Sequence, residues 1–357
     1  MLLLRRIKEK MKLLTDFSMQ ELKDLMASYK EPSFRAEQLL LNLHTGKDFA
    51  EMTNIGKALK DKLIEDGYAA VGVRILENYV SKLDGTVKFL FSLNDGNIVE
   101  GVLMRYKYGN TLCISTQVGC RMNCAFCASG LEGLKRNLTA GEILGEVIAA
   151  NRFDGGDLAD RKITNIVLMG SGEPLDNYDN VVKFLRLVNA EKGLNVSYRN
   201  ISLSTCGLID AFDRFLEEDI PVTMTFSLHA ATDEVRSSIM PVNKKYGVDK
   251  VIDAAKRYFE RTKRRVVFEY SLIKGVNDRP EDAAALISRV KGFPCIVNLI
   301  VLNYVKERGL DGTSRKDAYR FSGLLEKAGV AVTVRRTMGA DIEGACGQLR
   351  AKYIKNN

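Results

Sequence analysis

The sequence has no tryptophan, only two histidines and only six prolines in 357 residues. It also has no hydrophobic run of the length that a membrane span needs, and the N-terminal stretch "MLLLRRIKEKMKLL" meets charged residues too early for a secretory signal. Sequence repeats and low-complexity segments are absent as well. These absences argue against a secreted or membrane protein, and we expect a cytoplasmic one.

Cysteine is more informative, with seven copies in a chain that lacks a secretory signal. An odd number of cysteines in such a chain disfavours a disulfide framework and favours metal binding or thiol chemistry. A hydrophobic fraction of 46% with 27% charged residues is typical of a globular protein. The length allows one large domain and a small accessory one.

The formal net charge is +8. Basic residues gather in four segments: "RRIKEKMK", "RYFERTKRR", "TVRRTMG" and "LRAKYIKNN". Each segment taken alone also fits a solvated helix face. Together they favour an anionic macromolecular partner, most simply nucleic acid.

The N-terminal part of the chain differs in pattern from the rest. Residues 1–75 have helical periodicity and a capping box formed by Ser18 and Glu21, which predicts a helical accessory domain that docks onto a substrate or a larger domain. Residues 76–105 contain two β-rich runs around Asp95-Gly96 and predict a β-hairpin that acts as a linker.

Strand-like and helix-like segments alternate over residues 106–340, and residues 341–357 form a C-terminal segment. A second capping box, Thr139 with Glu142, opens one of the helices. This alternation predicts an α/β fold, a partial (β/α)6 barrel of the TIM type with its chemistry at the C-terminal ends of the strands. A doubly wound sheet is the alternative, which the lack of G-x-G-x-x-G disfavours. The predicted strands are "TLCIST", "ITNIVLMG", "NISLST", "VTMTFSL", "VVFEYSLI", "IVNLIVLN" and "VAVTVRR".

Three cysteines, Cys120, Cys124 and Cys127, fall within eight residues of the loop after the first predicted barrel strand. Thiolates at these spacings can bind three irons of a [4Fe–4S] cluster and leave the fourth iron open for a small molecule. The alternatives are a zinc site completed by a remote residue and unliganded core cysteines. Zinc sites favour paired C-x-x-C units, and the chain has no second pair.

C-x-x-x-C-x-x-C with Phe126 before the last cysteine resembles the signature of the radical S-adenosylmethionine (SAM) superfamily. There the open iron binds SAM, and one electron from the cluster cleaves it to a 5′-deoxyadenosyl radical. Residues 15–352 further resemble the RlmN family of dual-specificity ribosomal and transfer RNA adenine-C2 methyltransferases. The motifs that carry this resemblance are "GNTLCISTQVGCRMNCAFCASGLEGLKRNLTAGEI", "GSGEPLDN", "LSTCG", "FSLHA", "MPVNKKY" and "GADIEGACGQL".

The resemblance implies a SAM site at the ends of the barrel strands. Two positions depart from the family: Ser171 stands where a methionine is usual, and Tyr304 stands where a proline is common after Asn303. The implied SAM-binding residues are Phe126, Gly172, Glu173, Ser204, Ser227, Leu228, His229 and Asn303.

Outside the cluster, the resemblance implies three catalytic residues. Cys346 would carry the methyl group as S-methylcysteine, and Cys113 would release the product through a transient disulfide with Cys346. Glu100 would accept a proton; a plain exposed strand carboxylate is the alternative. One histidine and two cysteines match no family role, and we expect them to be structural: His44, Cys206 and Cys295.

The implied reaction is methylation of carbon 2 of an adenosine in 23S rRNA, at the peptidyl-transferase centre, and in tRNA, next to the anticodon. This electron-poor carbon does not react with the electrophilic methyl group of SAM. In the family one SAM methylates Cys346, and a radical from a second SAM takes hydrogen from that methyl group, so two SAM molecules are used per turnover. The resemblance also implies a low-potential electron donor such as flavodoxin or ferredoxin and RNA binding by residues 1–75. We expect a monomer.

Three other functions remain open at this stage. A C8-specific 23S rRNA adenine methyltransferase that confers antibiotic resistance shares every catalytic residue named. A glycyl-radical activase needs the cluster but neither Cys113 nor Cys346. An iron–sulfur protein that only binds RNA needs neither Glu173 nor a SAM pocket.

Overall fold

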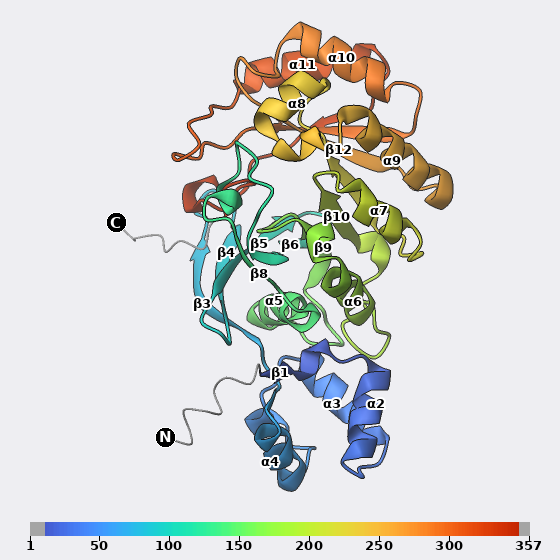
Figure 1. Ribbon diagram of the computed structural model, residues 1–357. Helices are drawn as coiled ribbons and strands as arrows, with labels where there is room; N and C mark the ends of the chain where they lie inside the picture. The colour runs from blue at the N-terminus through green and yellow to red at the C-terminus, as the bar shows by residue number, and fades with distance from the viewer. Residues whose placement is uncertain (1–10, 350–357) are drawn as a thin grey trace.

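The structure is a computed structural model that describes residues 11–349. The basic segments "RRIKEKMK" and "LRAKYIKNN" fall almost entirely outside these residues. Within residues 11–349 the chain forms an N-terminal helical region and an α/β body built on a ten-stranded sheet (Figure 1). No helix in this part of the chain combines the length and the apolar character needed to cross a membrane.

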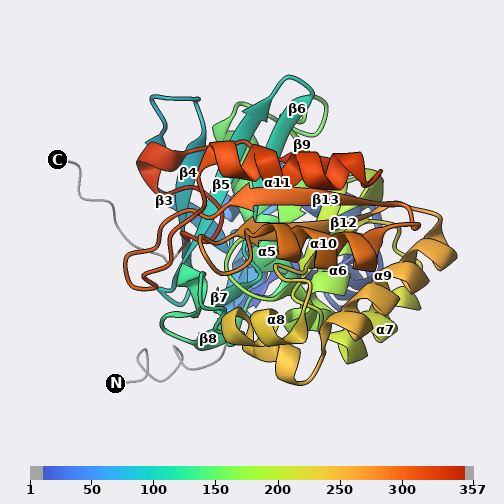
Figure 2. The same cartoon turned by 90° about the horizontal axis from the view of Figure 1, so that it is seen from above.

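Parallel strands form the barrel part of the sheet, and helices cover its outer side (Figures 1 and 2). Every predicted barrel segment overlaps one of these strands, so the predicted partial barrel is confirmed, with β14 as a short strand at its edge. In spatial order the strands are β6 (Gly109–Cys113), β9 (Ile163–Leu168), β10 (Ile201–Thr205), β11 (Thr223–Ser227), β12 (Val266–Leu272), β13 (Cys295–Val301) and β14 (Val332–Val334). The helices are α5 (Ala140–Phe153), α6 (Tyr178–Val188), α7 (Ile209–Leu216), α8 (Asp233–Ile239), α9 (Val248–Thr262), α10 (Pro280–Val290) and α11 (Arg315–Lys327).

Alternation along each strand separates the core from the barrel interior. On β11, Met224 and Phe226 join the apolar core under the helices, whereas Thr225 and Ser227 line cavities inside the barrel. Phe226 packs edge-to-face on Phe212 of α7, with ring centroids 5.4 Å apart, and burial of such a ring contributes about 2–3 kcal/mol. The strands therefore hold polar groups inside the barrel without weakening its core.

The predicted hairpin is present as β4 (Val87–Leu93) and β5 (Ile98–Tyr106), with Gly96 at positive φ in its turn. An additional strand, β3 (Val73–Val80), begins inside the segment that we expected to be helical. It was missed because it lies at the sheet edge, where most of its side chains are exposed and the apolar alternation is weak. All three strands continue the barrel sheet through antiparallel pairing of β5 with β6, so this segment is an integral part of the sheet.

The N-terminal region contains α2 (Met19–Ser28), α3 (Phe34–His44) and α4 (Lys57–Glu65) around a small apolar core of its own. Both predicted capping boxes, one at Ser18 and one at Thr139, are present. The region contacts the body at α5, where the backbone N–H of Gly141 donates to Asp16 over 2.6 Å. A side chain at Gly141 would lie 2.6 Å from the Asp16 backbone nitrogen, so this contact requires glycine.

His44 is a second link between the helical region and the body. Its imidazole is buried, and its Nδ1 accepts a 3.2 Å hydrogen bond from the backbone N–H of Leu194, in the loop after α6. Burial lowers the pKa of His44 from 6.5 to about 4.

We predict that His44 makes the stability of the protein depend on pH. Because its pKa is lower in the folded state, the unfolded state takes up the proton first, and about 3 kcal/mol of stability is lost as the pH falls from about 6.5 to 4. The urea midpoint should therefore fall more steeply between pH 7.5 and 5 in the wild type than in His44→Gln, whose side chain accepts the same hydrogen bond without titrating. The same pH dependence in both proteins would contradict this role.

Candidate active site

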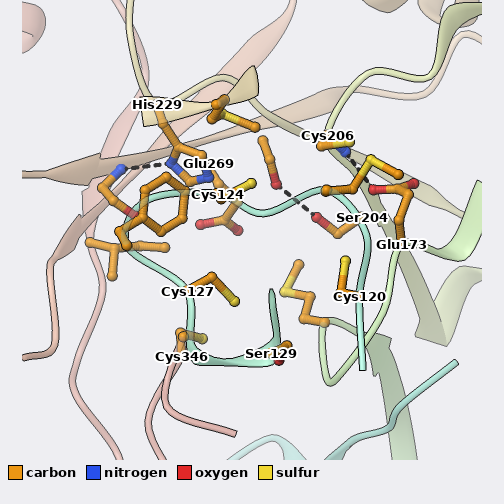
Figure 3. Close-up of a pocket in the computed structure, with 18 of the residues that line it drawn as sticks. Cys120, Cys124, Cys127, Ser129, Glu173, Ser204, Cys206, His229, Glu269 and Cys346 are labelled. Atoms are coloured by element: carbon orange, nitrogen blue, oxygen red, sulfur yellow. Dashed lines mark hydrogen bonds between the residues drawn. The ribbon is translucent and has the colours of Figure 1, made fainter. Parts of the chain in front are cut away.

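The carboxyl ends of the barrel strands surround a cavity of about 160 Å³ (Figure 3). Parallel strands bring their C-terminal loops to one end of a barrel, and the sequence predicted the chemistry at this end. The predicted site residues that line the cavity are Cys120, Cys124, Phe126, Cys127, Gly172, Glu173, Ser204, Ser227, His229 and Cys346. The predicted site residues that do not line it are Glu100, Cys113, Leu228 and Asn303.

The cysteine loop runs from β7 (Gln117–Gly119) to the short helix at Ala128–Gly130. Its entry requires glycine, because Gly119 has φ +77° and a side chain there would lie 1.9 Å from the carbonyl oxygen of Gly133. Arg308, from the loop after β13, fixes the far side of the loop. Its Nε donates to the carbonyl oxygen of Cys127 over 2.9 Å, and its Nη2 donates to Asn123 over 3.0 Å.

The three thiols of this loop suit a cluster. They are spread around the wall of one cavity, and a cubane binds each cysteine through a different iron. Within residues 11–349, no three Cys, His, Asp or Glu side chains are grouped so that they could hold a single metal ion. Burial raises the pKa of Cys120 to about 12, so an electropositive ligand is needed to hold it as a thiolate.

Glu173 places a buried carboxylate at the cavity wall. The backbone N–H groups of Cys206 and Leu175 donate to it over 2.8 and 3.1 Å. Burial raises the pKa of Glu173, and the hydrogen bond from Cys206 opposes this shift. A ligand ammonium would favour the ionised form, so this carboxylate fits the amino group of SAM. Gly172, at φ +111°, leaves no room for a side chain, which would lie 2.7 Å from Thr116 Oγ1.

Polar groups from the ends of β10 and β11 also line the cavity. The hydroxyl groups of Ser204 and Ser227 lie 3.3 Å apart. His229 has φ +55° and its Nδ1 accepts a 3.0 Å hydrogen bond from the backbone N–H of Ser271, so its proton resides on Nε2. Burial lowers the pKa of His229 to about 3, which keeps the imidazole neutral. The ring of Phe126 meets it edge-to-face with centroids 4.8 Å apart.

Arg236 of α8 is a residue of this site that the sequence analysis missed. Its guanidinium is fully buried and donates to the backbone carbonyl oxygens of Cys206 over 2.7 Å, Ser227 over 3.0 Å and Leu228 over 2.9 Å. It also donates to Asn243 over 2.9 Å. Asn243 belongs to the motif "MPVNKKY", and this motif was the sequence feature that could have pointed to Arg236. Leu228 thus takes part through its backbone, while its side chain lies in the core.

Cys346 lies between two cavities. One is the cavity lined by the three loop cysteines, here called the cluster cavity. The other is smaller and is also lined by Cys113, Asn303 and Arg335; it is called the Cys113 cavity. The amide of Asn303 donates to the carbonyl oxygen of Cys346 over 3.0 Å. The structure therefore places Asn303 against the Cys346 backbone, and it does not line the cluster cavity. Next to Cys346, the carbonyl oxygen of Gly347 accepts a 2.8 Å hydrogen bond from the backbone N–H of Ala128, which directly follows Cys127 of the cysteine loop.

Cys113 is at the end of β6, opposite Val102 of β5. Its thiol is buried, and burial raises its pKa to about 12. All seven cysteines are free in the structure, Cys113 and Cys346 included. The two cysteines expected to be structural, Cys206 and Cys295, are buried, although Cys206 also lines the cluster cavity.

Glu100 is not the exposed strand carboxylate that was the alternative interpretation, since only 1% of it is exposed. It forms a 2.8 Å salt bridge with Lys88 of β4, which is equally buried. Lys88 also contacts the carbonyl oxygen of Glu343 over 3.3 Å. Glu100 lies two residues before Val102 on the same face of β5, so it is next to the Cys113 cavity but outside it.

Two further residues of the site were not predicted from the sequence. Glu269 of β12 lines the cluster cavity, and the amide of Asn298 donates to both of its oxygens over 3.0 Å. Arg335 was noted only as part of a basic segment, yet it lines both cavities beside Cys346. The nearby Cys346 side chain is the main cause of the raised pKa of Arg335.

Known proteins resemble both parts of the chain. The profile of the Radical SAM superfamily matches residues 114–287. The profile of the Ribosomal RNA large subunit methyltransferase N-terminal domain matches residues 13–68. A crystal structure of a radical SAM methyltransferase from Sphaerobacter thermophilus superposes with a TM-score of 0.91 at 40% identity, covering 96% of this chain and 100% of that one.

Curated relatives match over almost their entire length. The protein of Clostridium perfringens strain 13, a "Probable dual-specificity RNA methyltransferase RlmN", is 51% identical over 349 residues, which are 97% of this chain and 99% of the relative. The protein of the same name from Alkaliphilus oremlandii is 48% identical, covering 98% and 100%. Identity and coverage of this extent establish kinship along the whole chain, and the chain therefore belongs to the RlmN family of the radical SAM superfamily.

Proposed function

We propose that this protein is a SAM-dependent RNA methyltransferase with a radical mechanism, and that it methylates carbon 2 of an adenosine in 23S rRNA and in tRNA. One observation carries the proposal: Cys346 lies on the shared wall of the cluster cavity and the Cys113 cavity. A carrier thiol needs access both to bound SAM and to the residue that later releases the product. This position gives Cys346 both.

The superfamily implies a [4Fe–4S] cluster and SAM. Cys120, Cys124 and Cys127 would hold the cluster, and Glu173 with Ser204, Ser227 and His229 would bind SAM. Bound together, cluster and SAM supply a 5′-deoxyadenosyl radical. We propose that two SAM molecules are used per turnover, one for methylating Cys346 and one for this radical.

The cysteines outside the cluster have separate tasks. The radical would take one hydrogen atom from the S-methyl group of Cys346, and the remaining carbon would bond to carbon 2 of the adenine ring. The ring would then lose the hydrogen on carbon 2 as a proton and return one electron to the cluster that had supplied it, which leaves Cys346 joined to the RNA. The Cys113 thiolate would attack the Cys346 sulfur, the bond between that sulfur and the transferred carbon would break, that carbon would take up a proton to become the methyl group of the RNA, and a disulfide would remain that cellular thiols reduce. Because the pKa of Cys113 is raised to about 12, its thiol needs a base. Glu100, near the Cys113 cavity, is the proposed proton acceptor.

The other expectations from the sequence fit this proposal. The helical region within residues 1–75 would bind structured RNA, and the C-terminal segment 341–357 would present Cys346. A flavodoxin or ferredoxin would supply electrons to a cytoplasmic monomer. Mass analysis of nucleosides from methylated 23S rRNA and tRNA separates methylation at carbon 2 from methylation at carbon 8.

We predict that the anaerobically purified protein is brown and contains about four irons per chain. Cys124→Ala should lose the colour and all SAM cleavage, because one iron loses its ligand. Cys295→Ala is the matched control, since Cys295 is buried outside the cavity, and it should keep both. Iron determination and absorption spectra check the result. Native protein that contains zinc and no iron contradicts the prediction.

We also predict that Cys346→Ala abolishes methyl transfer, because the first SAM then has no acceptor. Cys113→Ala should instead accumulate protein joined to RNA, because only release fails. Denaturing gels should show a ribonuclease-sensitive shift in Cys113→Ala and none in the double variant. Normal turnover by Cys113→Ala, or a shift that survives the loss of Cys346, would exclude these roles.

A further inference from the structure

The barrel interior has a second opening, away from the cluster. A cavity of about 440 Å³ lies among the N-terminal halves of the strands, between the β5–β6 turn and the residues that follow β14. It shares Met169, Glu269 and Arg335 with the cluster cavity, and Met169 and Arg335 with the Cys113 cavity. The three cavities therefore adjoin at Met169 and Arg335, and Cys346 lines two of them.

Two stacked tyrosines form one edge of the opening. The rings of Tyr106 and Tyr108 are 4.9 Å apart and nearly parallel, at 6°. Tyr106 is half-buried, whereas Tyr108 is 74% exposed, so the stack presents an open aromatic face to solvent. The turn between β5 and β6 extends beyond α11 at the edge of the molecule in Figure 2. Exposed aromatic faces of this kind bind unpaired nucleotides by stacking.

Three arginines are among the other residues that line this cavity. Arg199, Arg335 and Arg336 line the opening, and among the described residues none of them forms a salt bridge, whereas Arg105 just outside is paired with Asp154. The carboxylate that lines the same cavity, Glu269, is deep inside, where burial raises its pKa. The entrance is thus cationic, and guanidinium groups bind phosphates through paired N–H donors.

We propose that this opening admits the target nucleotide of the RNA, unpaired and turned out of its helix. Its base would stack on Tyr108, the phosphates beside it would bind Arg199 and Arg336, and the interior would lead the base past Met169 and Arg335 to Cys346. A base inside a helix is closed to an active site within a barrel, so it must leave the stack before it can react. The proposal rests on the proposed function, because it assumes an RNA substrate.

The test compares Tyr108→Ala and Arg199→Ala with matched substitutions on the outer helix α11, Tyr319→Ala and Arg320→Ala. Tyr319 is 56% exposed, and Arg320 is an exposed arginine. The probe is an in-vitro transcribed tRNA, with affinity measured by fluorescence anisotropy over a range of salt concentrations. Iron content and SAM affinity, measured on each preparation, verify that the cluster cavity is intact.

Tyr108→Ala should weaken RNA binding about tenfold, and Tyr108→Phe should restore it, because a phenyl ring stacks equally well. Arg199→Ala should lower the salt dependence of binding by about one counterion, and Arg199→Lys should retain it. Both alanine variants should methylate RNA at a correspondingly lower kcat/KM. The α11 variants should bind and methylate like the wild type.

The possible failures are distinct. If the wild type methylates RNA and Tyr108→Ala and Arg199→Ala bind it equally well, this inference is overturned and the proposed function stands. If these variants bind RNA normally but are reduced more slowly by flavodoxin, the surface belongs to the electron donor and the inference is again overturned. If the wild type leaves RNA unmethylated, the proposed function itself fails.

Discussion

The site depends on one buried cation. Arg236 has no exposed surface, and burial lowers its pKa, so its charge is sustained by the backbone carbonyls that it contacts. Those carbonyls belong to Cys206, Ser227 and Leu228, at the ends of two neighbouring strands. An isolated charge in the interior costs several kcal/mol unless it is fully hydrogen-bonded. Moving either strand end would break hydrogen bonds to the buried Arg236 guanidinium, so Arg236 holds both strand ends in place.

From this fixed wall the remaining contacts extend outward. The Cys206 amide holds Glu173, and the residue after Leu228 is His229, whose left-handed backbone turns its ring toward Phe126 of the cysteine loop. The same loop contacts the segment that carries Cys346 through Gly347. The proposed cluster ligands, SAM-binding residues and carrier cysteine are therefore connected by hydrogen bonds to the backbone and by one ring contact, which hold their relative positions.

Three adjoining cavities in the barrel interior are consistent with the order of the proposed reaction. Cys346 lines the cluster cavity and the Cys113 cavity, and the third cavity, whose opening carries basic and aromatic residues, adjoins both at Met169 and Arg335. In the proposed reaction, SAM and the RNA would thus approach the sulfur of Cys346 from different directions. The antiparallel strands β3–β5 make this possible, because they extend the sheet beyond β6 and carry Tyr106 with its turn beyond the parallel strands.

The sequence by itself determined the barrel strands, the capping boxes, the cysteine loop and ten of the residues that line the cluster cavity, because each depends on local periodicity or on a short motif, whereas Glu269 and Arg335 were missed. It did not determine the edge strand β3, whose weak apolar alternation carries little signal. Only the tertiary structure decided that Lys88 pairs with Glu100, that Arg236 joins two strand ends and that Asn303 contacts Cys346. Arg236 is 30 residues from Cys206 and Asn303 is 43 residues from Cys346, so no local pattern joins these partners. Lys88 and Glu100 lie on one hairpin, and their contact depends on the register of its two strands, which a single sequence does not fix.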